Sequence, residues 1–121
     1  MSTQMEFKFE PVTYDIDDYA SQAHDFAIYP EAGTGSEREL SYLALGLMGE
    51  SGEVAEKIKK LIRDGKFDRE AVSKELGDVF WYLTQLCLAL NKNPSRVLSD
   101  NLRKLKDRKN RNVIQGEGDN R

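Results

Sequence analysis

The chain has 121 residues, of which 39% are apolar and 32% are charged, and its formal net charge is −3. This length is typical of one domain, and the composition is that of a folded protein rather than a disordered one. The small negative charge gives no overall electrostatic reason to bind a nucleic acid or an anionic membrane. We therefore expect a single domain over residues 1–121, with neither of these as a partner.

Cysteine use and hydropathy indicate the compartment. Cys87 is the only cysteine, which excludes an intramolecular disulfide and a clustered Cys/His zinc site. The N-terminus has no apolar signal core, and the longest uncharged stretch, residues 79–91, is too short to cross a bilayer. The sequence predicts a soluble protein of the reducing cytoplasm.

The first half of the chain predicts an arm and two helices. Residues 1–13 show no clear period and are interpreted as an N-terminal arm. Apolar residues then recur at helical spacing over residues 16–27, which predicts a first helix that ends near Pro30. Ser36, followed three residues later by Glu39, is a capping-box signature for a second helix, and Gly65 is a natural end for it.

The second half predicts two more helices and a tail. Asp68 can cap a third helix, whose apolar residues spread over several sides up to Leu90, and Asn93 with Pro94 can begin a fourth. The segment 110–121 is interpreted as a polar C-terminal tail. The fold class predicted is all-α, an antiparallel bundle of about four helices. Its many apolar sides indicate packing against another subunit.

Two acidic pairs stand out, because residues three apart lie on one face of a helix. These are Glu50/Glu53 in the second helix and Glu75/Asp78 in the third. At about 100° per residue, the first acid of each pair falls roughly 60° from the middle of its apolar stripe and the second roughly 120°. If the two helices form an antiparallel hairpin, equal offsets bring both pairs to one flank. The alternative is a solvated surface.

Four carboxylates at one cleft would raise one another's pKa unless a cation compensated them. Ligands that are all oxygen select hard ions, which favours Mg²⁺, with Mn²⁺ as a substitute. Such an ion neutralises phosphate charge and lowers the pKa of a water molecule without help from a histidine. His24, the only histidine, is interpreted as a surface residue.

Other residues on this face each have a functional and a structural interpretation. Lys57 either meets a phosphate or forms an ion pair with Glu53, and Tyr82 either contacts sugar or phosphate or packs in the core. Three glycines in the second helix either leave space for a phosphate or allow close helix packing: Gly46, Gly49 and Gly52. In the fourth helix, a polar face either binds substrate or is only solvated: Asn101, Lys104 and Arg108.

The segments GLMGESGEVAEKIKK, KELGDVFWYL, NLRKLKDRKNR and GEGDNR together resemble MazG-like nucleoside triphosphate pyrophosphohydrolases over most of the chain. The family signature, Glu-x-x-Glu followed by Glu-x-x-Asp, matches the two acidic pairs residue by residue. The N-x-x-K of the fourth helix matches at Asn101 and Lys104. The resemblance implies the all-α NTP pyrophosphatase fold, with bundles that pair as dimers or dimers of dimers and Mg²⁺ held by the four acids.

The implied reaction is hydrolysis of an NTP or dNTP to the nucleoside monophosphate and pyrophosphate, with water attacking the α phosphorus. Within the same fold, a narrower pyrophosphohydrolase acting on pyrimidine dNTPs or phosphoribosyl nucleotides is an alternative. An alternative from another class is a non-catalytic helical module, in which basic residues in and just after the fourth helix contact a partner or a nucleic acid: Arg103, Lys104, Lys106, Arg108, Lys109 and Arg111.

Overall fold

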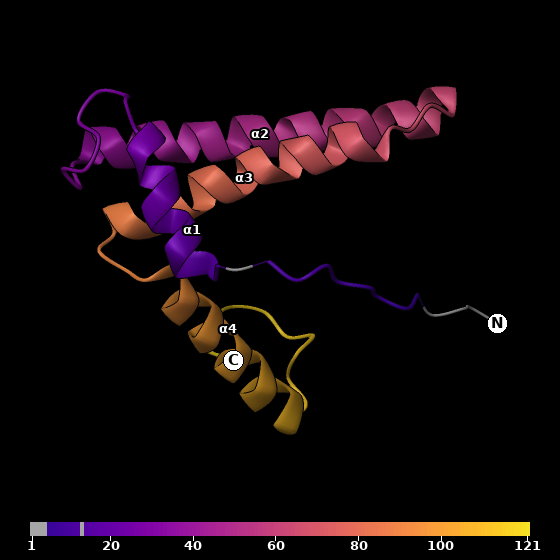
Figure 1. Ribbon diagram of the computed structural model, residues 1–121. Coiled ribbons are helices and arrows are strands. Elements are labelled where there is room, and N and C mark those ends of the chain that lie inside the picture. Colours follow the sequence, from indigo (N-terminus) through magenta and orange to yellow (C-terminus); the bar gives the residue numbers. More distant parts are fainter. Residues whose placement is uncertain (1–4, 13) are drawn as a thin grey trace.

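The computed structural model describes residues 5–12 and 14–121, so the parts of the predicted arm at residues 1–4 and 13 lie outside the described residues. The described residues are all-helical and contain no strand, which confirms the predicted fold class. The elements are α1 (Ile16–Ala23), the short 3₁₀ helix η1 (His24–Phe26), α2 (Glu37–Asp64), α3 (Arg69–Ala89) and α4 (Pro94–Asn110). In Figure 1, α2 and α3 form a long antiparallel hairpin, α1 crosses beside it, and α4 extends away from it.

Local caps place the ends of the hairpin where the sequence predicts them. The Ser36 hydroxyl accepts the N–H of Glu39 at 3.2 Å, and the Asp68 carboxylate accepts the N–H of Ala71 at 3.1 Å. Gly65 ends α2 with φ at 69°, a left-handed conformation that suits glycine. The first helix ends earlier than predicted, because residues 24–26 tighten into η1 and Ala27 leaves the helical region.

Glu39 makes a different set of contacts from those of a capping box. Its carboxylate accepts the N–H groups of Gly33 and Gly35 and the hydroxyl of Tyr29, and the residue is only 1% exposed. These bonds join the loop before α2 to the first turn of the helix. The carboxylate therefore holds the loop, while the Ser36 hydroxyl alone caps the helix.

Small residues let α1 pack closely on the C-terminal half of α3. Ala20 and Ala23 are buried, and their carbonyl groups accept hydrogen bonds from Gln85 at 3.2 Å and from the Trp81 indole at 3.1 Å. His24, interpreted as a surface residue, is exposed and pairs its Nδ1 with the Gln85 side chain at 2.9 Å. Because Gln85 is almost fully buried, these bonds fix the crossing of α1 over α3.

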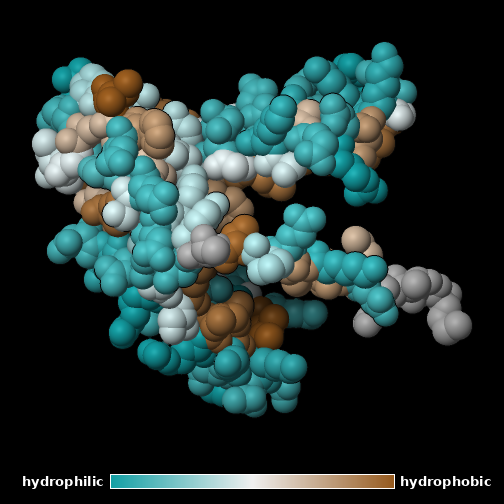
Figure 2. Space-filling model, in the orientation of Figure 1, coloured by the Kyte–Doolittle hydropathy of each residue, from teal (hydrophilic) through white to brown (hydrophobic). Residues whose placement is uncertain are grey.

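A single chain leaves much of its apolar surface uncovered. On α2 alone, Leu45, Met48 and Ile62 are between 71% and 83% exposed, and Figure 2 shows several apolar patches on the surface. Apolar surface of this extent is typical of a chain that associates. None of the described helices has the length and apolarity that crossing a bilayer requires.

Candidate metal centre

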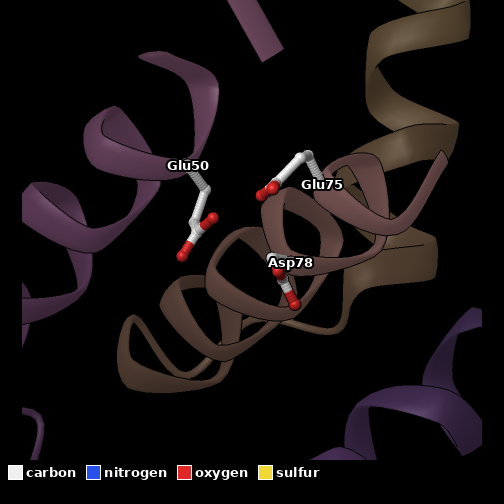
Figure 3. A group of neighbouring side chains, drawn as sticks. All are labelled: Glu50, Glu75 and Asp78. Carbon is white, nitrogen blue, oxygen red and sulfur yellow. The ribbon is translucent and has the colours of Figure 1, made fainter. Parts of the chain in front are cut away.

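Three of the four predicted acids come together between the two helices of the hairpin. Glu50 belongs to α2, and Glu75 and Asp78 belong to α3. One carboxylate oxygen from each lies within 4.8 Å of the others, and Figure 3 shows the three side chains in the space between the helices. The antiparallel hairpin therefore brings acids far apart in the sequence to one flank, as their equal offsets predict.

Glu53 lies outside this group. It is exposed, one turn further along α2 than Glu50. Its offset of roughly 120° from the apolar stripe, against roughly 60° for Glu50, turns it away from α3. Its role as a metal ligand stays a prediction.

The group carries more negative charge than its neighbours compensate. Partial burial raises the pKa of Glu50, and the nearby carboxylates of Asp78 and Glu75 raise it further. Lys57 Nζ lies 3.7 Å from Glu75 Oε1, so Lys57 belongs to this group. Its ion-pair partner is Glu75 rather than Glu53, which was the partner in one of the two interpretations of this residue. Three carboxylates beside one ammonium group leave an excess of negative charge, which suits a divalent cation.

The donor set fits a hard ion. All three groups offer oxygen, and oxygens on opposite sides of an octahedral Mg²⁺ are about 4 Å apart, close to the spread of this group. Glu50, Glu75 and Asp78 are therefore the residues that could hold Mg²⁺ or Mn²⁺.

Gly46 and Tyr82 pack against each other beside these acids. A Cβ on Gly46 would lie 2.1 Å from Cε1 of Tyr82. Close helix packing, rather than space for a phosphate, therefore explains this glycine. No atoms lie within 4 Å of the same position at Gly49 or Gly52, which leaves space there. Tyr82 also meets Trp81 edge-on, with ring centroids 5.0 Å apart. Its role as a substrate contact stays a prediction.

An aromatic hollow adjoins the acids, and the sequence interpretation missed its two tyrosines. Tyr14 and Tyr19 line two neighbouring open cavities of about 310 and 300 Å³, the first together with Trp81 and the second together with Phe80. Gly77, the residue before Asp78, lines the second cavity, so this wall lies beside that acid. The pKa of Tyr19 is raised by burial and also by the negative charge of Asp78. Tyr19 appeared in the sequence only as part of an apolar stripe, and Tyr14 had no periodic signal.

The predicted polar face of α4 does not reach the acids of the same chain. Helix α4 follows the C-terminal end of α3 (Figure 1), whereas Glu75 and Asp78 lie in the N-terminal half of α3. Asn101 and Lys104 instead line an open cavity of about 570 Å³ on α4, together with residues that include Arg96.

Arg108 lies under the C-terminal tail, which folds back on α4 (Figure 1). Although most of α4 is exposed, Arg108 is 4% exposed, and its guanidinium donates to the main-chain oxygen of Asp119 at 2.9 Å. Lys104 pairs with the Asp119 carboxylate at 3.3 Å. Neither interpretation of this face, substrate binding or solvation, included the tail. The aspartate in GEGDNR, Asp119, was the available signal.

Comparisons with known proteins identify the family of this chain. Residues 38–113 match the MazG nucleotide pyrophosphohydrolase domain, a stretch that contains both acidic pairs. The chain belongs to the MazG family. It is also similar to the gene 37 protein of Mycobacterium phage L5, with 48% identity over 112 residues that cover 88% of this chain and 98% of that protein. No solved structure matches it.

Membership of the MazG family confirms the resemblance drawn from the motifs. The family implies a nucleotide substrate, and its members generally depend on a divalent metal. The acidic group of Glu50, Glu75 and Asp78 is the candidate for that metal in this MazG domain.

Proposed function

We propose that this chain is a Mg²⁺-dependent nucleoside triphosphate pyrophosphohydrolase that converts an NTP or dNTP to the nucleoside monophosphate and pyrophosphate. The convergence of Glu50 with Glu75 and Asp78 inside a MazG domain carries the proposal. No other residue type is needed, since carboxylates alone can hold the metal.

In the proposed reaction, the oxygen of a water molecule bonds to the α phosphorus. The bond from that phosphorus to the α–β bridging oxygen breaks, and pyrophosphate leaves with the electron pair. Bound Mg²⁺ supplies charge neutralisation and lowers the pKa of water. Glu50, Glu53, Glu75 and Asp78 act as ligands, and one of these carboxylates takes the proton of the attacking water.

The aromatic hollow supports a place for the nucleoside. Tyr14, Tyr19 and Phe80 line a cavity beside Asp78, and its volume of about 300 Å³ is at the small end of ligand sites. Lys57 and Tyr82 lie on the same flank as candidate contacts for phosphate or sugar. The small volume of this cavity favours the smaller pyrimidine bases over purines, which supports the narrower pyrimidine or phosphoribosyl enzyme as a second candidate.

Association of two or four copies is part of the proposal. It would cover the exposed apolar side chains of α2 and α3. It is also the arrangement that could bring Asn101 and Lys104 of one copy to the acids of another. Burial of Arg108 beneath the tail removes this cation both from the candidate phosphate contacts and from the basic surface of the non-catalytic module.

The direct test is pyrophosphate release from a panel of NTPs, dNTPs and phosphoribosyl nucleotides with Mg²⁺. We expect Glu53→Gln and Asp78→Asn to lower kcat by about a hundredfold or more, a loss typical of removing a group that acts in the reaction. Glu70→Gln, an exposed acid in the first turn of α3, is the matched control and should keep full activity. Release from none of the substrates, or full activity in both variants, would disprove the proposal.

A further inference from the structure

The N-terminal arm has a period that the sequence interpretation missed. From Met5 to Glu10, apolar and charged residues alternate strictly: Met5, Phe7 and Phe9 are apolar, whereas Glu6, Lys8 and Glu10 are charged. A period of two is that of a β-strand with one apolar face. The expectation that residues 1–13 show no clear period is therefore wrong for residues 5–10.

This strand pattern has no partner strand among residues 5–12 and 14–121. The described residues contain no strand, and in Figure 1 the arm runs away from the helices. Met5, Phe7 and Phe9 are 76%, 73% and 85% exposed. The rings of Phe7 and Phe9 stack with centroids 6.0 Å apart, so they lie on one side of the arm. One apolar edge is therefore presented to solvent.

We propose that the arm pairs with the same arm of a second copy, as an antiparallel two-stranded ribbon centred on Phe7. In this register, Phe7 faces Phe7 of the other copy and Met5 faces Phe9. Glu6 faces Lys8 on both sides of the two-fold axis. Every apolar residue then meets an apolar residue, and every charge in residues 6–8 meets its opposite.

The charge pattern excludes the neighbouring arrangements. A ribbon centred on Lys8 places Lys8 opposite Lys8 and Glu6 opposite Glu10. A parallel in-register pair places each charge opposite itself. A shift of one residue puts apolar side chains opposite charged ones. Pro11, which has no N–H to donate, ends the strand just beyond the paired residues.

The ribbon adds to a contact between helical bodies rather than replacing it. Two strands alone are marginally stable in water. The apolar side chains of both arms share one face, and the bodies leave further apolar surface exposed for them to meet. The occupant of the arm's apolar edge is thus a second copy of this chain, in a two-fold symmetric dimer. This inference does not depend on the enzymatic activity.

A charge-reversal cycle on the full chain tests the pairing. Glu6→Lys or Lys8→Glu alone places like charges opposite each other twice, and each should weaken self-association by about tenfold in sedimentation equilibrium. The double variant E6K/K8E restores opposite charges and should associate like the original chain. An equal mixture of the two single variants should form the mixed dimer in preference to either homodimer. Single variants that associate unchanged, or a double variant that stays weak, would overturn the register.

Cysteine cross-linking tests the centre of the ribbon independently of affinity. In a Cys87→Ala background, Phe7→Cys places two thiols directly opposite each other, within the Cα separation that a disulfide spans. Phe9→Cys is the matched control, since in this register its partner is Met5 and its two copies lie about four residues apart along the ribbon. We expect oxidation to link Phe7→Cys at least tenfold faster. Equal rates, or no linked dimer from either variant, would contradict the proposal.

Discussion

The closest packing beside the acidic group is between Gly46 of α2 and Tyr82 of α3. A Cβ at position 46 would overlap the Tyr82 ring, whose Cε1 would be 2.1 Å away. Tyr82 follows Asp78 by one helical turn, so a displaced ring disturbs the part of α3 that carries this acid. The glycine thus sets how near the two helices approach at the site.

Gly46→Ala should therefore destabilise the fold despite the better helix propensity of alanine. Overpacking costs about 1–3 kcal/mol, whereas the propensity gain is at most about 1 kcal/mol. Gly49→Ala is the matched control, because nothing lies near its Cβ position, and it should raise stability by up to about 1 kcal/mol. Urea denaturation measures both effects. A Gly46→Ala protein as stable as Gly49→Ala would show that Tyr82 moves freely.

At the scale of elements, the sequence predicted what local chemistry decides. The start of α2 at Ser36 and of α3 at Asp68, and the end of α2 at Gly65, depend on residues at most four apart. The partners of Glu39 could not be found in this way, because they depend on how the loop of residues 29–36 folds. The capping-box motif named the right residue and assigned it the wrong partner.

Glu39→Gln should destabilise the protein by about 2–3 kcal/mol at neutral pH, because a charged acceptor of three hydrogen bonds is lost. Burial opposes ionisation of Glu39, but the bonds from Gly33, Tyr29 and Gly35 outweigh it and hold its pKa below the ordinary 4.5. A lowered pKa contributes stability that is complete above the ordinary value and is lost as the pH falls toward the lowered one.

The difference in unfolding free energy between the original chain and Glu39→Gln should thus be largest near pH 7 and shrink below about pH 4. Urea denaturation at both pH values measures it. Glu37→Gln, an exposed acid in the same first turn, should show little change at either pH. A difference that grew on acidification would mean that the carboxylate is not held ionised by the loop.

For the whole molecule, the sequence predicted the grouping of the acids correctly where the hairpin of α2 and α3 alone determines it. Helical offsets placed Glu50 with Glu75 and Asp78, because α2 and α3 are joined by a short turn. The position of α4 depends instead on the bend after α3 and on bonds such as that from the Ser95 N–H to Asp17, 2.9 Å long. Spacing within one helix carries no information on such distant contacts. The aromatic hollow and the tail over Arg108 were missed for the same reason.

Because the candidate site joins two helices, ligand binding should stabilise the entire fold. A ligand that binds only the folded state at a hundred times its Kd adds about 2.7 kcal/mol. We expect Mg²⁺ with a non-hydrolysable nucleoside triphosphate to raise the Tm of the original chain and of Glu70→Gln, as measured by calorimetry. Asp78→Asn should lose this increase, since one of the three converging carboxylates becomes neutral. Mg²⁺ alone should raise the Tm less than Mg²⁺ with the nucleotide, because phosphate oxygens are expected to complete the coordination of the ion. An equal increase in the Tm of Asp78→Asn would mean that the nucleotide binds elsewhere.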